Sequence, residues 1–238
     1  MSVIEDRAIV LRGWKLGETD RIVSLLCENS GKVRAVAKGV RKSTSKFGGR
    51  LEPFSECRVS LWKGRGELLT ISQVDTERSN VGLSEDLDKL VKASAIAELL
   101  DKIAVEAVDT SALYALTSRA FGNLASDNSV NFLSAYFLRV ATIEGVTPEC
   151  EACIECGSTA DLTYFDANGG GVRCQVHPSG AMLTPGALEL LRLGIQGRIA
   201  ELLARSEHQA AMELEGIVVS YLRSSFGVDL RVLRANLH

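Results

Sequence analysis

The chain has 238 residues, of which 46% are hydrophobic and 24% charged, with six cysteines and a net charge of −3. These values are typical of a globular protein that buries its own core, in two or three small domains. No apolar run reaches the roughly 18 residues of a membrane span, and the first residues lack the apolar segment of a signal peptide. We therefore expect no membrane partner and a reducing, cytoplasmic location without a disulfide framework.

Charge is unevenly distributed along the chain. Residues 1–80 contain 15 Lys/Arg and 10 Asp/Glu, a net charge of +5. The remaining residues contain 12 Lys/Arg and 20 Asp/Glu, a net charge of −8. A basic module joined to an acidic one indicates a polyanionic partner for the basic module.

Residues 1–78 have the pattern of short β-strands. Apolar and alternating runs predict strands over residues 8–11, 21–27, 32–38, 58–62 and 68–71. The alternation within residues 32–38 would place Val33, Ala35 and Ala37 on one face. The opposite face would then carry Lys32, Arg34, Val36 and Lys38. About five strands with little helix predict a small barrel, either an OB-fold or an SH3-like barrel.

A basic stretch lies between residues 31 and 51, which include seven cations and no acidic residue. The cations are Lys32, Arg34, Lys38, Arg41, Lys42, Lys46 and Arg50. Residues 39–50 read as a loop rich in Gly, Ser and Thr, and mobile cations with hydroxyl donors suit a phosphate backbone. Phe47 has few apolar neighbours in the sequence, so we predict that its ring is exposed and stacks on a base. The alternative is a solvated loop whose charge run has no function.

The other aromatic residues of this section are more consistent with core positions than with stacking platforms. They are Trp14, Phe54 and Trp62. Cys27 and Cys57 lie in apolar strand patterns, and we expect both to be core residues.

Helical patterns follow residue 80. A first helix is predicted to start near Ser84. Further helices are predicted near residues 111–121 and 130–143, after Thr184-Pro185, and over residues 208–226. Between the third and fourth helices lies a cysteine-rich region with a short strand at residues 162–165.

The cysteine-rich region contains Cys153-x-x-Cys156 and, further along, Cys174-x-x-His177. Two pairs of soft ligands at this spacing are the pattern of a tetrahedral structural zinc site, with one Zn²⁺ held by four side chains. Cys150 lies three residues before Cys153 and is a competing fourth ligand in place of His177. A third interpretation, buried free thiols, explains the clustering poorly.

These patterns together predict an α+β multidomain chain. Residues 1–80 would form a nucleic-acid-binding OB-fold β-barrel, and residues 81–238 a helical domain with a zinc knuckle inserted at about residues 149–180. A closed four-ligand site leaves no open position for catalysis. The sequence also lacks a phosphate-binding loop of the Gly-x-x-x-x-Gly-Lys type and a Gly-x-Ser-x-Gly motif. We therefore predict that the protein is not an enzyme.

Several motifs resemble those of the bacterial RecO family, in the same order along nearly the whole chain. The N-terminal motifs are Gly17-Glu18-x-Asp20-Arg21-Ile22-Val23, Gly31-Lys32-Val33, Ala37-Lys38-Gly39-Val40-Arg41-Lys42-x-x-Ser45-Lys46 and Arg50-Leu51-Glu52-Pro53-Phe54. The later motifs are Gly145-x-x-Pro148-x-x-x-x-Cys153-x-x-Cys156-Gly157 and Phe165-Asp166-x-x-x-Gly170-Gly171-Val172-x-Cys174. In the family the fourth metal ligand is usually a cysteine, whereas His177 stands here.

The resemblance implies an N-terminal OB-fold, a helical domain and a zinc knuckle. It implies a recombination mediator in DNA repair, which binds single- and double-stranded DNA and anneals complementary strands. The implied partners are RecR and single-strand-binding protein, with RecA loaded indirectly, and the implied location is the nucleoid. Two other functions stay open: a scaffold or regulator whose basic loop binds protein or RNA, and a DNA-processing enzyme.

Overall fold

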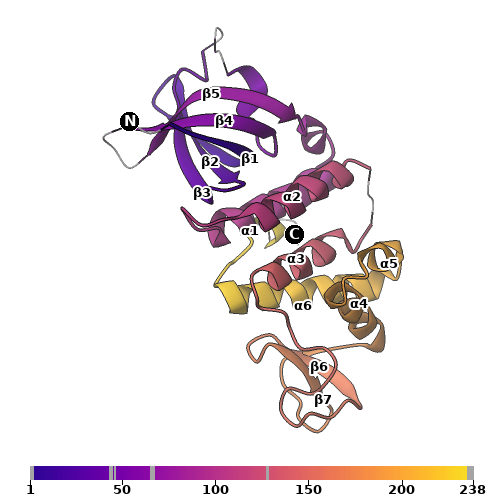
Figure 1. Ribbon diagram of the computed structural model, residues 1–238. Coiled ribbons are helices and arrows are strands. Elements are labelled where there is room, and N and C mark those ends of the chain that lie inside the picture. Colours follow the sequence, from indigo (N-terminus) through magenta and orange to yellow (C-terminus); the bar gives the residue numbers. More distant parts are fainter. Residues whose placement is uncertain (1–2, 43–44, 46, 65–67, 127–128, 235–238) are drawn as a thin grey trace. The chain divides into compact units, whose positions relative to one another are not determined.

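The computed structural model describes residues 3–42, 45, 47–64, 68–126 and 129–234 (Figure 1). The chain divides into two compact units. One comprises Met1–Ser126 together with Leu230–His238, and the other comprises Asp127–Asp229. In the described part of the chain, none of the helices has the length and apolarity needed to cross a membrane.

The first unit contains a closed five-stranded barrel. Its strands are β1 (Val3–Leu16), β2 (Asp20–Cys27), β3 (Lys32–Ala37), β4 (Glu56–Lys63) and β5 (Leu69–Arg78). Around the barrel they follow the order β1-β2-β3-β5-β4, and only the contact between β3 and β5 is parallel. A β-bulge between Val10 and Arg12 lets the long strand β1 bend, so that it pairs with both β2 and β4. The barrel confirms the predicted OB-fold.

The barrel core is made by the inward-facing residues of each strand. Val33, Ala35 and Ala37 lie in it, as their alternation predicts, and Cys27 and Cys57 are fully buried there. The loop after β3 contains a short 3-10 helix, Gly48–Leu51, and this loop contributes two further core residues. They are Phe47 and Leu51.

Two helices, α1 (Leu87–Ile103) and α2 (Ser111–Leu124), cluster with the barrel rather than with the second unit. Ser24 Oγ on β2 donates to the Asp101 carboxylate on α1 at 2.6 Å. The Phe54 ring packs edge-on against Phe121 of α2, with centroids 5.5 Å apart. The domain boundary expected after residue 80 is therefore not the boundary between the two units. That residues 81–238 fold as one domain stays a prediction.

The start of α1 differs from the prediction. Asp86, not Ser84, is the N-cap, and its carboxylate accepts the backbone N–H of Lys89 at 3.1 Å. Ser84 instead ends a short 3-10 helix, Val81–Ser84. An aspartate and a serine cap a helix about equally well, so the choice between them depends on the preceding turn.

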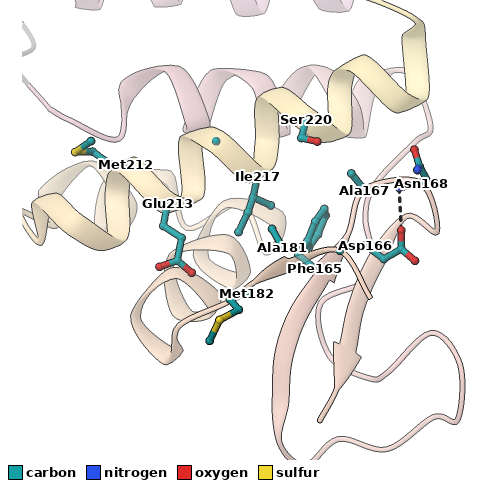
Figure 2. Close-up of a pocket in the computed structure, with 12 residues that line it drawn as sticks. Phe165, Asp166, Ala167, Asn168, Ala181, Met182, Met212, Glu213, Ile217 and Ser220 are labelled. Carbon is teal, nitrogen blue, oxygen red and sulfur yellow. Dashed lines mark hydrogen bonds between the residues drawn. The ribbon is translucent and has the colours of Figure 1, made fainter. Parts of the chain in front are cut away.

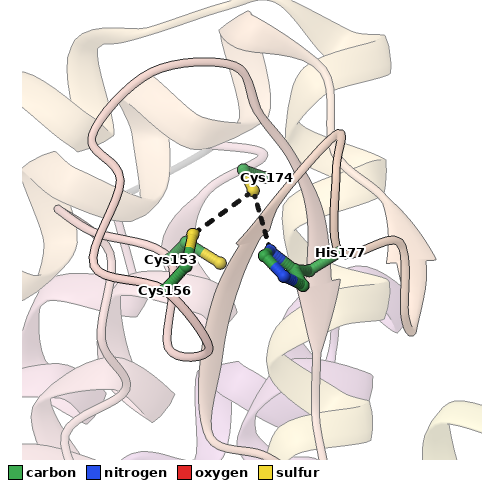
Figure 3. Close-up of side chains that lie close together, drawn as sticks. All are labelled: Cys153, Cys156, Cys174 and His177. Atoms are coloured by element: carbon green, nitrogen blue, oxygen red, sulfur yellow. Dashed lines mark hydrogen bonds between the residues drawn. The ribbon is translucent and has the colours of Figure 1, made fainter.

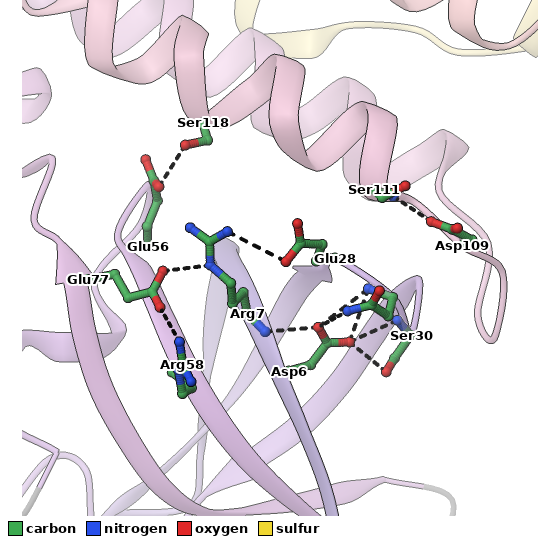
Figure 4. A network of polar contacts seen from close by, with 11 residues as sticks. Asp6, Arg7, Glu28, Ser30, Glu56, Arg58, Glu77, Asp109, Ser111 and Ser118 are labelled. Carbon is green, nitrogen blue, oxygen red and sulfur yellow. Dashed lines mark hydrogen bonds and ion pairs between the residues drawn. The ribbon is translucent and has the colours of Figure 1, made fainter.

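Polar contacts tie the turns of the barrel together (Figure 4). The buried Asp6 carboxylate accepts the Ser30 backbone N–H at 2.9 Å and the Ser30 hydroxyl at 2.7 Å. Glu77 accepts from Arg7 at 2.8 Å and from Arg58 at 3.2 Å, which links β1, β4 and β5. Ser118 on α2 donates to Glu56 at 2.8 Å.

The second unit is helical, with a small sheet. Its helices are α3 (Phe132–Ile143), α4 (Pro185–Ile195), α5 (Ile199–Ala204) and α6 (His208–Phe226). Its strands β6 (Leu162–Asp166), β7 (Gly171–Cys174) and β8 (Ala181–Met182) form a sheet in the order β7-β6-β8. A last short helix, α7 (Arg231–Arg234), belongs to the first unit. The sheet lies between α3 and α4 in the chain, at the predicted position of the inserted knuckle.

Candidate metal centre and nucleic-acid interface

Four side chains converge beside strand β7 (Figure 3). The ligand atoms of Cys153, Cys156, Cys174 and His177 all lie within 4.8 Å of one another. The Cys156 and Cys174 sulfurs are 3.8 Å apart, and Cys174 Sγ lies 3.4 Å from His177 Nδ1. Metal–sulfur bonds of about 2.3 Å place the corners of a tetrahedron about 3.8 Å apart. The spacing of the four residues predicted as ligands therefore fits tetrahedral coordination of one metal ion.

Local backbone turns bring the ligands together. The Gly157 N–H donates to the Cys153 carbonyl at 2.8 Å, and Gly157 has a left-handed φ of 74° that glycine adopts without strain. The His177 N–H donates to the Cys174 carbonyl at 3.0 Å. The two Cys-x-x-ligand pairs are thus closed turns, one before β6 and one at the end of β7 in the chain, and each directs two side chains to one point.

The environment favours thiolates. Burial raises the pKa of Cys153, but backbone N–H groups of three neighbouring residues outweigh it and lower the pKa to about 6. The contact with His177 lowers the pKa of Cys174 and raises that of the imidazole. Thiolates are the form of cysteine that binds metals. The cluster can hold a soft divalent cation such as Zn²⁺.

Cys150 lies outside this cluster. It is buried, and its thiol points to the Glu151 carboxylate at 3.7 Å. Burial raises its pKa to about 12, with a further contribution from Glu151. A thiol in this position is neutral, so of the two ligand sets that the sequence leaves open the structure assembles the one containing His177.

Asp166 is a supporting residue that sequence reasoning missed. Its carboxylate accepts the Gly169 N–H at 2.9 Å and the Arg173 guanidinium at 2.9 Å, and so fixes the turn between β6 and β7. The Gly169 N–H, against some desolvation and with help from Arg173, lowers the pKa of Asp166. The pattern Asp-x-x-Gly, typical of a turn closed by an aspartate side chain, was a signal that could have identified it.

The predicted DNA-binding cations follow β3 and the loop after it, and the structure places them differently. Arg34, Lys38 and Lys42 are exposed. Lys32 is half-buried, because its ammonium donates to the Asp101 carbonyl at 2.7 Å. Arg41 is exposed, with its guanidinium donating to the Glu18 carbonyl at 2.9 Å.

Arg50 and Lys46 are the other two predicted DNA-binding cations. Arg50 is exposed, and its guanidinium lies 3.3 Å from the Val74 carbonyl. Lys46 lies outside the described residues. The basic loop is anchored at its start by Asp20, which accepts the Gly39 N–H at 2.8 Å. This hydrogen bond is the main cause of the lowered pKa of Asp20.

The assignment of Phe47 as a base-stacking residue is wrong. Only 2% of its surface is exposed, and it belongs to the barrel core. Leu51, the last residue of the short 3-10 helix, is buried with it. Phe47 has few apolar neighbours in the sequence, but the core residues of the barrel supply its apolar contacts.

The three other aromatic residues predicted to lie in the core, Trp14, Phe54 and Trp62, differ in burial. Phe54 is a core residue, as predicted, with 4% of its surface exposed. Trp14 and Trp62 are only half-buried. The Arg12 guanidinium lies over the Trp14 ring, 4.5 Å from its centroid, and also pairs with Asp101 at 3.3 Å.

Two hollows differ in the charge of their walls. A groove of about 870 Å³ in the first unit is lined by Lys32, Arg34 and Lys63 together with Glu106 and apolar residues. A smaller cavity of about 360 Å³ lies between α6 and strands β6 and β8 in the second unit (Figure 2). Its walls include Phe165 and Ile217, and none of the described residues that line it is basic. Only the first groove suits a polyanion.

The fold and the site together define a class: a protein with an OB-fold barrel, a basic strand and loop, and a separate knuckle that fits a structural metal ion. Residues 1–80 match the family model described as Recombination protein O N terminal, and residues 84–234 match Recombination protein O C terminal. A DNA repair protein RecO from Bifidobacterium adolescentis is 39% identical over 181 residues, covering 73% of each chain. The chain belongs to the recombination protein O family, whose role is in DNA repair and recombination.

Proposed function

We propose that the protein is a recombination mediator that binds single- and double-stranded DNA without sequence preference and anneals complementary strands. With RecR it would help to load RecA onto DNA coated by single-strand-binding protein. Family membership supports these partners. The work would take place on chromosomal DNA, in the cytoplasm at the nucleoid.

The observation that carries this proposal is the position of the exposed cations. Arg34 and Lys38 alternate outward along and just beyond β3, and Lys42 follows in the loop. Four residues of a strand span about 13 Å, so Arg34 and Lys38 can each meet a different phosphate along one nucleic-acid strand. Contacts to phosphates carry no sequence information, so binding would be non-specific and sensitive to salt.

Annealing would follow from charge alone. A surface that holds two strands neutralises part of their mutual repulsion and raises their local concentration. No bond is made or broken, so we propose that the protein is not an enzyme. We also propose that residues 1–80 are the nucleic-acid-binding domain and that the metal ion is a single structural Zn²⁺.

The proposal is tested by fluorescence-polarisation titration of labelled single-stranded DNA across a salt series, beside a strand-annealing assay. The triple variant Arg34→Ala, Lys38→Ala and Lys42→Ala should bind less tightly and anneal more slowly. Because each lost single-strand phosphate contact removes about 0.7 from the logarithmic salt slope, the slope should fall by about two units.

A matched control removes three cations of the second unit, each of which pairs with a carboxylate of the same unit: Arg198, Arg205 and Arg223. It changes the net charge equally and should leave the slope unchanged. Equal slopes in the wild type and the first triple variant would overturn the assignment of the interface. No binding to DNA even at low salt would favour the scaffold alternative, in which the basic loop binds protein or RNA.

A further inference from the structure

One row of side chains crosses the outer face of three neighbouring strands. Trp14 on β1 pairs with Ile22 on β2, and Ile22 pairs with Val36 on β3. Val23, which follows Ile22, and Ala35 and Ala37, on either side of Val36, lie in the barrel core. The row itself therefore faces outward, and its three side chains are half-buried. Side chains directly opposite each other on paired strands lie about 5 Å apart, so the row forms one continuous apolar strip.

The neighbouring row on the same face meets helix α1 at its central residue. It consists of Arg12, Ser24 and Arg34, which are paired across the same strands. Ser24 is fully buried, because its hydroxyl donates to Asp101 of α1. The Arg12 guanidinium is also paired with Asp101. Helix α1 thus covers the centre of this row at Ser24, whereas Arg12 and Arg34 at its two ends are exposed beside the apolar strip.

Charges border the strip on both sides. Arg34 and Lys38 lie two residues before and two residues after Val36, on the same outer face, and both are exposed. Asp20 holds the equivalent position beside Ile22, but its carboxylate is occupied by the Gly39 N–H and the Thr19 hydroxyl, each at 2.8 Å. Apolar side chains flanked by cations are the combination that binds the bases and phosphates of a single strand.

We propose that Trp14, Ile22 and Val36 form a base-stacking platform for single-stranded DNA, with Trp14 as its main contact. An incoming base meets the Trp14 indole and the Arg12 guanidinium that lies over it, and bases stack on both kinds of plane. Arg34 and Lys38 then hold the phosphates on either side. This inference rests on the proposed function and deepens it, because it names the part of the interface that distinguishes single from double strands.

The platform would discriminate single-stranded from double-stranded DNA because a duplex has no unstacked bases. The bases of double-stranded DNA are already stacked on one another, so the duplex meets the cations but not the platform. The cations therefore set the affinity for both kinds of DNA, whereas Trp14 adds affinity for single strands only.

The test uses the small number of tryptophans. The chain has two, Trp14 and Trp62. In a Trp62→Phe background, all tryptophan emission comes from residue 14. Titration with an oligothymidylate of about 15 nucleotides should quench this emission, and a duplex of the same length should quench it far less.

Affinities of variants give the second measurement. Trp14→Ala should weaken single-strand binding about tenfold, leave duplex binding within about twofold, and leave the salt slope unchanged, since no ionic contact is lost. Trp14→Phe keeps an aromatic face and should restore most of the affinity. Retained duplex binding shows that the alanine variant is folded.

The outcomes separate this inference from the function on which it rests. Salt-sensitive single-strand binding that neither quenches Trp14 nor responds to Trp14→Ala overturns the platform and leaves the mediator intact. Equal losses for single and double strands also overturn it, because they indicate a structural role for Trp14. Absence of any DNA binding by the wild type overturns both.

Discussion

At the scale of single residues, the cysteine-histidine cluster separates the two candidates for a fourth ligand, His177 and Cys150. His177 Nδ1 lies 3.4 Å from Cys174 Sγ, whereas Cys150 turns away to Glu151 and burial keeps its thiol protonated. Proximity in sequence to Cys153 would have favoured Cys150. The distinction depends on which side chains the small sheet brings to one point.

The ligand assignment predicts opposite outcomes for two serine substitutions. Cys174→Ser should reduce bound zinc from about one ion per chain to nearly none and destabilise the second unit, because a structural site needs all four ligands. Cys150→Ser should retain the ion. Zinc content by elemental analysis after dialysis is the measurement. Loss of zinc from the Cys150 variant together with retention in a His177→Ala variant would reverse the assignment.

At the scale of elements, the turn between β2 and β3 is fitted tightly against the connection between α1 and α2. Gly31 has a φ of 73°, and a side chain there would lie 2.2 Å from the Val105 carbonyl oxygen. The backbone N–H of Lys32 donates to that same carbonyl at 3.0 Å. The strand that carries the cations proposed to bind DNA is therefore held at its start by backbone contacts with the helical connection.

A pair of glycine substitutions measures this fit. Gly31→Ala should destabilise the first unit by about 3 kcal/mol or more, through both the left-handed φ and the backbone collision. Gly17→Ala is the matched control, since Gly17 has a φ of 60° but no atom near its missing side chain, and should cost only about 1 kcal/mol. Urea unfolding followed by tryptophan emission checks both. Equal costs would mean that the turn has room to move.

At the scale of the whole molecule, the metal centre and the barrel belong to different compact units. Both tryptophans lie in the barrel, on β1 and β4. Tryptophan emission therefore reports the first unit alone. Helical circular dichroism reports both units, because α1 and α2 belong to the first and α3 to α6 to the second. A change in circular dichroism without a change in emission is therefore a change in the second unit.

Chelation of the metal should thus affect one unit. A strong chelator should lower the temperature at which helical circular dichroism is lost, because the folding energy of the knuckle comes from its metal. The transition seen by tryptophan emission, and the affinity for single-stranded DNA, should change little. A parallel shift of both transitions would show instead that the two units unfold as one cooperative block.

The sequence by itself determined the features that depend on local spacing. The spacing of Cys153, Cys156, Cys174 and His177 specified the four side chains that converge, and strict alternation over residues 32–38 specified which side chains of β3 enter the core. The helix over residues 208–226 was also predicted correctly, because the spacing of its apolar residues and the signals at its two ends lie within the segment itself. Such local patterns can be interpreted without knowledge of the rest of the chain.

Only the tertiary structure decided the features that depend on distant pairing. Phe47 looked exposed beside its polar neighbours, yet the closed barrel supplies its apolar contacts. Trp14 looked like a core residue, yet the β-bulge and the register with Ile22 turn it to the outer face. Strand register and barrel closure bring together residues far apart in the sequence, so no local pattern could assign these two aromatics correctly.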